Sequence, residues 1–177
     1  MVKLSSSTTK KIALTALLAA AAIIVHTVEA LMPPLIPGVP VRLGLANVFT
    51  LLALMLVGAP YAAAVAVLRC LVSVLITGAV SQLPYSLAGA LLSFFVMVVV
   101  ESLRRKERVS AVGESVLGSF AFNVGQLIVG ILFAWQAMVF YFPIMSLLSV
   151  PTGIFTGLIT HYVFRVLQKA FHEENEL

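Results

Sequence analysis

The feature that most constrains the fold of this chain is a series of long apolar stretches with very few charges inside them. The first stretch, residues 12–31, contains one carboxylate and no lysine or arginine. About 20 mainly apolar residues are enough for a helix to cross the hydrocarbon core of a bilayer. Only 10% of the 177 residues are charged, whereas a soluble domain has about 25%. We therefore predict an all-α integral membrane bundle whose outer surface faces lipid.

Turn-forming and charged segments divide the chain into six expected transmembrane helices within one membrane domain, residues 1–177. Residues 32–43 contain four prolines, which fix the backbone and lack an N–H, so this segment is expected to be a stiff loop. The second expected helix is short for a full crossing, and Pro60 is expected to begin the third. The six expected spans are residues 12–31, 44–58, 61–77, 85–100, 111–133 and 143–167.

The lysine and arginine residues predict the orientation of this bundle, because basic loops are retained on the cytoplasmic side of a membrane. The basic residues of the amino-terminal segment, of residues 101–110 and of the carboxy-terminal tail all fall on one side. Only Arg42 falls on the other side. We therefore expect a multi-pass protein of the plasma membrane with both termini in the cytoplasm.

Several polar side chains are expected at membrane depth, where an ionisable group costs at least about 2.5 kcal/mol and therefore usually faces protein or a cavity. In the predicted orientation most of them fall in the outer half of the membrane, with Arg69 near the midplane. Such sorting by depth favours a pocket that opens outward. The candidate substrate-binding residues are His26, Glu29, Arg42, Asn47, Arg69, Asn123 and Gln126.

The same residues also have structural interpretations. Arg69 requires an anionic partner, which is either Glu29 or the carboxylate or phosphate of a ligand. Asn123 and Gln126 could instead form hydrogen bonds between helices. Glu29 could form a buried ion pair with His26 that fixes the first helix against its neighbours.

Three polar residues are expected nearer the membrane surfaces. Arg42 is either at the mouth of the pocket or simply an interfacial charge. Glu114 and His161 fall near the cytoplasmic ends of their helices. We expect their side chains to reach the polar headgroups or to cap the helices.

The sequence also excludes several kinds of chemistry. It contains no aspartate, and prenyl transferases hold magnesium and diphosphate with paired aspartates. Its single cysteine, Cys70, excludes an intramolecular disulfide and a Cys-ligated cluster. It has no ATPase-type phosphate-binding loop. We therefore expect no catalytic residues, no bound metal and no cofactor, and at most a non-catalytic role in an enzyme complex.

Pairs of small residues four positions apart indicate where helices approach closely. Gly153 and Gly157 in the last expected helix favour packing inside the bundle. Ala16 and Ala20 lie in an alanine-rich first helix, which could also offer a face to a second membrane protein.

Three short motifs carry a resemblance to a known family over nearly the whole chain. They are Arg-Leu-Gly-Leu-Ala-Asn at residues 42–47, Leu68-Arg69, and Phe-Asn-Val-Gly-Gln-Leu at residues 122–127. On these motifs the chain resembles the Gx transporter family, also described as heptaprenyl diphosphate synthase component I. The size, the six helices and the Pro-rich first outer loop are similar to the substrate-binding S components of energy-coupling factor (ECF) transporters.

These resemblances imply different partners. The S-component resemblance implies an outward-facing ligand pocket under a lid formed by the first loop. It also implies docking through Ala16 and Ala20 onto a transmembrane T subunit that carries two ATPases. The synthase description implies a subunit of an enzyme complex. Family members are also similar to membrane proteins of flavin-based electron transfer systems, which implies a quinone or redox role.

Two functions are therefore predicted. The first is a membrane-embedded, substrate-binding subunit for uptake of a small anionic or zwitterionic solute. The alternative is a non-catalytic membrane subunit of a polyprenyl diphosphate synthase or of a quinone- or flavin-linked electron transfer complex. A purely structural scaffold fits less well, because it has no need for an arginine at the midplane.

Overall fold

The computed structural model describes residues 7–32, 43–134 and 137–174. These residues form six α-helices and one short 3-10 helix, with no strand among them, so the predicted all-α fold is confirmed. The elements are α1 (Thr8–Leu31), α2 (Asn47–Leu56), α3 (Ala59–Thr77), η1 (Val80–Gln82), α4 (Leu83–Arg104), α5 (Ala111–Ala134) and α6 (Ala137–Glu174).

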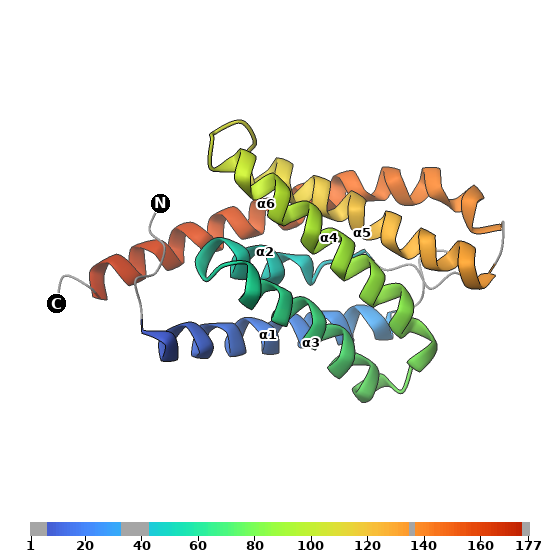
Figure 1. Cartoon of the computed structure of the whole chain (residues 1–177), viewed down its shortest axis with the longest axis horizontal. Helices are drawn as coiled ribbons and strands as arrows, with labels where there is room; N and C mark the ends of the chain where they lie inside the picture. Colours follow the sequence, from blue (N-terminus) through green and yellow to red (C-terminus); the bar gives the residue numbers. More distant parts are fainter. Residues whose placement is uncertain (1–6, 33–42, 135–136, 175–177) are drawn as a thin grey trace.

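Five long helices form an arc around the short helix α2. Helix α1 packs on α3, α3 on α4, α4 on α5 and α5 on α6, and α2 contacts all five. Figure 1 shows the start of α1, the loop between α4 and α5, and the end of α6 at the same end of the molecule. We call this end, which carries the charged loop, the basic end.

The outer surface of the arc is apolar. The five long helices are each long and apolar enough to cross a membrane. Large hydrophobic side chains point outward from all of them, and examples are Leu17, Leu75, Val99, Leu132 and Leu147. A multi-pass membrane bundle follows, because water would not solvate such a surface.

Helix α2 differs from the other five. It has ten residues, nine of them buried, and a helix that is hydrophobic on all sides belongs in a core. At 1.5 Å per residue it is about 15 Å long, roughly half the thickness of the hydrocarbon core. The expected span of residues 44–58 shortens to this length because Gly44 and Gly58, with φ of 75° and 117°, leave helical geometry at both ends.

Helix α6 is longer than expected at both ends. Its expected start, Pro143, lies inside the helix together with Pro151, which helices in membrane bundles tolerate. Beyond residue 167 the helix continues to Glu174, because the polar tail is rich in Gln, Lys, Ala and Glu, which are good helix formers.

Glycines let α5 approach α6 closely. A Cβ on Gly153 would lie 2.5 Å from Cα of Val116, and one on Gly157 would lie 2.7 Å from Cα of Val112. Both distances are far inside van der Waals contact, so larger residues would push the helices apart. The predicted packing role of Gly153 and Gly157 is confirmed.

Candidate functional site

The centre of the predicted pocket is the side chain of Arg69, which lies in the middle of α3 and is completely buried. Its Nη2 donates a hydrogen bond to Oδ1 of Asn47, the first residue of α2, over 2.6 Å. Its Cζ lies 5.9 Å from the centroid of the Phe122 ring on α5, within range of a cation–π interaction. Arg69 therefore connects α3 with α2 and α5.

Gly44 connects this group to α1. Its N–H donates a hydrogen bond of 2.6 Å to Oε1 of Glu29. Its φ of 75° is in the left-handed region, where glycine is favoured. A Cβ there would lie 3.0 Å from Cδ1 of Phe122 and 3.1 Å from Nδ2 of Asn47. We call Glu29, Gly44, Asn47, Arg69 and Phe122 the Arg69 cluster.

The Arg69 cluster retains hydrogen-bonding capacity. Glu29 is near enough to attract the guanidinium electrostatically, and the thiol of Cys70 also lies beside it. Within the described part of the chain, Nε and Nη1 of Arg69 and Nδ2 of Asn47 have no hydrogen-bond partner. Charge-assisted bonds from a guanidinium to carboxylate or phosphate oxygens are strong. An anionic oxygen is therefore the ligand group that these donors would favour, and binding of such a ligand stays a prediction.

The remaining predicted residues lie around this cluster or outside it. Nδ2 of Asn123 donates a hydrogen bond of 2.7 Å to the carbonyl oxygen of Met145, which joins α5 to α6. His26 on α1 and Gln126 on α5 are buried, with 0% and 1% exposure. Arg42 lies outside the described residues. A ligand contact by any of these side chains stays a prediction.

Ala16 and Ala20 are both exposed on α1. The buried residues of this helix, such as Leu18, Ala19 and Ala22, lie on a different face. The predicted docking face is therefore open to a partner, and docking itself stays a prediction.

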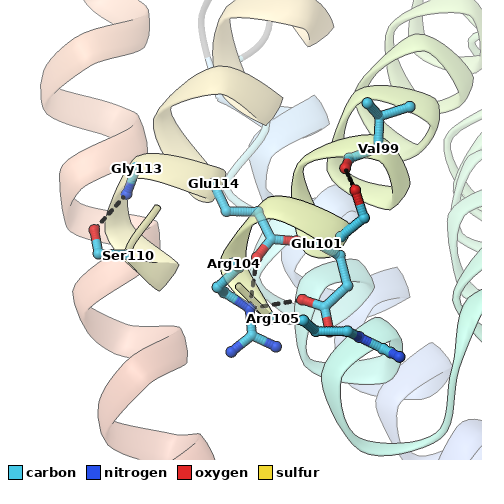
Figure 2. Close-up of polar contacts among 8 residues, drawn as sticks. Val99, Glu101, Arg104, Arg105, Ser110, Gly113 and Glu114 are labelled. Atoms are coloured by element: carbon cyan, nitrogen blue, oxygen red, sulfur yellow. Dashed lines mark hydrogen bonds and ion pairs between the residues drawn. The ribbon is translucent and has the colours of Figure 1, made fainter. Parts of the chain in front are cut away.

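A second group of enclosed charges, which was not predicted from the sequence, lies at the basic end. Nε of Arg104 lies 2.6 Å from Oε2 of Glu101 on the same helix and 2.9 Å from Oε2 of Glu114 on α5. Nε of Arg105 lies 3.0 Å from the other oxygen of Glu101. Figure 2 shows both glutamate side chains pointing toward Arg104. We call Glu101, Arg104 and Glu114 the Arg104 cluster.

The expectation that Glu114 reaches the headgroups or caps a helix is wrong, because its side chain is completely buried. The close packing of α4 against α5 encloses the carboxylate, and Arg104 supplies the opposite charge. The spacing of Glu101 three residues before Arg104 and four before Arg105 is typical of ion pairs on one helix face. That spacing is the signal that sequence analysis could have used.

A groove of about 750 Å³ lies beside the Arg104 cluster. We call it the basic groove. Its walls are the α4–α5 loop, the start of α5 and the last part of α6. Its basic lining consists of Arg104, Arg108, His161 and Arg165, and its apolar lining includes Leu158 and Phe164.

No group of three potential His, Cys, Asp or Glu metal ligands is found among residues 7–32, 43–134 and 137–174. The carboxylates of the Arg104 cluster already face the guanidinium groups of Arg104 and Arg105. The described side chains therefore favour recognition of anions.

The family model described as heptaprenyl diphosphate synthase component I matches residues 18–163. This range contains the whole Arg69 cluster, the whole Arg104 cluster and most of the basic groove. Neither the comparison with curated proteins nor the comparison with solved structures found a significant match.

Proposed function

The chain belongs to the heptaprenyl diphosphate synthase component I family, and we propose that it is the non-catalytic membrane subunit of a polyprenyl diphosphate synthase. The family match over residues 18–163 carries this proposal. The absence of aspartate from the sequence supports a non-catalytic role, since magnesium and diphosphate are usually held by carboxylate pairs. The catalytic carboxylates would then belong to a partner.

The physical logic of such a subunit follows from its substrate. A polyprenyl diphosphate has a strongly charged head and an apolar chain that grows with each condensation. The growing chain is more stable in lipid than in water, because each buried CH₂ contributes about 0.8 kcal/mol. A membrane subunit would hold a soluble synthase at the bilayer, where its product belongs.

The basic end is the face that would meet this partner. It carries Arg105, Lys106 and Arg108 on the α4–α5 loop, all of them exposed. Under the positive-inside rule this end faces the cytoplasm of a plasma membrane. A soluble synthase made in the cytoplasm would reach it directly.

Co-purification tests this proposal. The tagged chain would be isolated in mild detergent from its native membrane, and its partners identified by mass spectrometry. The expected partner is a soluble protein with aspartate-rich prenyl-synthase motifs. Recovery of a transmembrane T subunit with paired ATPases, or of a flavin-carrying redox protein, would contradict the proposal. Cells that carry the untagged chain are the control for background proteins.

A second candidate function is favoured by the Arg69 cluster. A completely buried guanidinium with two nitrogens lacking hydrogen-bond partners among the described residues fits a subunit that binds a small anionic or zwitterionic solute for uptake. In this proposal Glu29, Asn47 and Arg69 contact the solute, and the exposed Ala16 and Ala20 meet a T subunit of ECF type.

Native mass spectrometry of the purified chain tests the second candidate. A bound small anion is expected on the wild type and should be absent from Arg69→Gln. Arg105→Gln, which removes an exposed arginine at the basic end, is the matched control and should keep the anion. Equal ligand occupancy in wild type and Arg69→Gln would show that Arg69 does not bind the anion.

A further inference from the structure

The basic groove combines positive charge with an apolar wall. Among the described residues, three arginines and one histidine line it, against the one carboxylate of Glu107. Leu158 and Phe164 line the same groove from α6. A ligand that satisfies both parts has a multiply charged anionic head and an apolar tail.

The positive charges of Arg108 and Arg165 are available to a ligand. Arg108 and Arg165 are exposed and form no ion pair with any described residue. Arg104 meets both carboxylates of its cluster through Nε. Figure 2 shows its two terminal nitrogens directed away from Glu101 and Glu114, and one of them, Nη2, is buried without a hydrogen-bond partner among the described residues. Planar guanidinium groups of this kind bind phosphate oxygens in pairs of parallel hydrogen bonds.

The start of α5 adds to this positive potential. The helix begins at Ala111, and Ser110, Ala111 and Val112 all line the groove. The N–H of Gly113 is already bonded to Oγ of Ser110, whereas the N–H groups of Ala111 and Val112 have no partner within the helix and carry partial positive charge. Phosphate groups are therefore favoured at such an end, here beside three arginines.

We propose that the basic groove binds the diphosphate head of a polyprenyl diphosphate between Arg108 and Arg165, with the first isoprene units against Leu158 and Phe164. This inference rests on the proposed synthase role, because that role supplies the ligand. It adds to that role a product-holding site on this chain, close to where the partner would release its product.

Binding of farnesyl diphosphate to the purified full-length chain in detergent tests the site. The variant Arg108→Gln/Arg165→Gln is expected to bind this probe about tenfold more weakly or worse, since each arginine supplies charge-assisted bonds to the head. The matched control is Lys106→Gln/Lys169→Gln, which removes two exposed charges from the same two segments without changing the groove lining. The control should bind like the wild type.

Three further probes define the ligand class. Farnesol, which lacks the diphosphate, and inorganic diphosphate, which lacks the chain, should both bind much more weakly than farnesyl diphosphate. Leu158→Gln should weaken farnesyl diphosphate binding and leave the weak binding of inorganic diphosphate unchanged. Competition by phosphatidylglycerol at the same concentration as farnesyl diphosphate would overturn the proposal in favour of a general anionic-lipid site.

Other outcomes would also overturn the proposal. If the two double variants bind farnesyl diphosphate with equal affinity, Arg108 and Arg165 are not part of a binding site. If the wild type binds inorganic diphosphate as tightly as farnesyl diphosphate, the apolar wall does not contribute to binding. Because binding is measured without a partner, it is independent of co-purification. If the chain binds farnesyl diphosphate but co-purifies with no synthase, the proposed function is contradicted and the binding site is kept. If the chain co-purifies with a synthase but does not bind farnesyl diphosphate, the proposed function is kept and the binding site is contradicted.

Discussion

Arg69 and Arg104 are both enclosed in the bundle, and the difference between their partners separates two roles. Arg104 meets two carboxylates through one nitrogen, so its charge is matched by the protein itself. Arg69 donates to the neutral amide of Asn47, and two of its nitrogens have no hydrogen-bond partner in the described chain. We infer that the Arg104 cluster holds α4 to α5, whereas the Arg69 cluster can accept a ligand.

The structural role of Arg104 predicts a loss of stability in Arg104→Gln. This change leaves the buried carboxylate of Glu114 without its cation, close to Glu101, which keeps only the half-exposed Arg105. Breaking a fully buried pair costs about 3–5 kcal/mol, and since the Arg104 side chain is 16% exposed, we expect about 2–3 kcal/mol here. Thermal unfolding in detergent measures it.

Two companion variants make that prediction specific. Arg105→Gln removes a pair whose arginine is 51% exposed and should change stability by less than about 1 kcal/mol. Adding Glu114→Gln to Arg104→Gln should recover part of the loss by removing one carboxylate. Equal unfolding temperatures for Arg104→Gln and Arg105→Gln would show that the ion pairs of Arg104 stabilise the fold no more than the exposed pair of Arg105.

Gly44 gives a second prediction at the same scale. Gly44→Ala should destabilise the fold in two ways, through a left-handed backbone that costs a larger residue about 1–2 kcal/mol and through contact with Phe122 and Asn47. Gly78→Ala is the control, because Gly78 has a φ of 69° with nothing within 4 Å of its Cβ position. Gly44→Ala should therefore unfold at the lower temperature, and equal values would show that the cluster is loosely packed.

At the scale of elements, the sequence predicted helix number and order well because each apolar run ends at a glycine, a proline or a charged loop. The sequence predicted the start of α6 poorly, since a proline such as Pro143 can begin a helix or lie within one. Only the contact of α6 with α5 decides which of these two positions Pro143 takes. It could not predict that α2 is a central core helix, because periodicity is absent when all sides are buried. The charged cluster at Arg104 was missed for a similar reason, since it depends on how α4 meets α5.

The close approach of α5 and α6 predicts that Gly153→Ala is costly. The added Cβ would lie 2.5 Å from the backbone of Val116, which cannot move alone. Gly118→Ala is the control, because its Cβ would meet the flexible end of Met97. Overpacking costs about 1–3 kcal/mol, and we expect Gly153→Ala to lose more of the unfolding free energy than Gly118→Ala. The reverse order would mean that α6 shifts easily along α5.

At the scale of the whole molecule, two polar centres lie at different depths of one apolar bundle. The depth sorting of polar residues pointed to the Arg69 cluster, and the structure brings Glu29, Asn47 and Arg69 together there. The basic groove was not foreseen, because its residues come from two segments far apart in the sequence, the charged loop and the cytoplasmic end of the last expected helix. Folding places them side by side at the basic end.

The orientation of the bundle is itself testable by cysteine labelling. Cys70 is buried and can be replaced by alanine to give a background without thiols. A cysteine in place of the exposed Ser81 in η1 should react with an impermeant maleimide in whole cells, whereas one in place of Lys106 should react only after the membrane is opened. The opposite labelling pattern would place the basic end outside.

The most direct test of the central claim is the distribution of polyprenyl diphosphate synthase activity between the membrane and soluble fractions of cells with and without this chain. We predict that deletion of the chain moves the activity out of the membrane fraction, and that the wild-type chain restores it. Unchanged activity in the membrane fraction after deletion would contradict a role for this chain as the membrane subunit of the synthase.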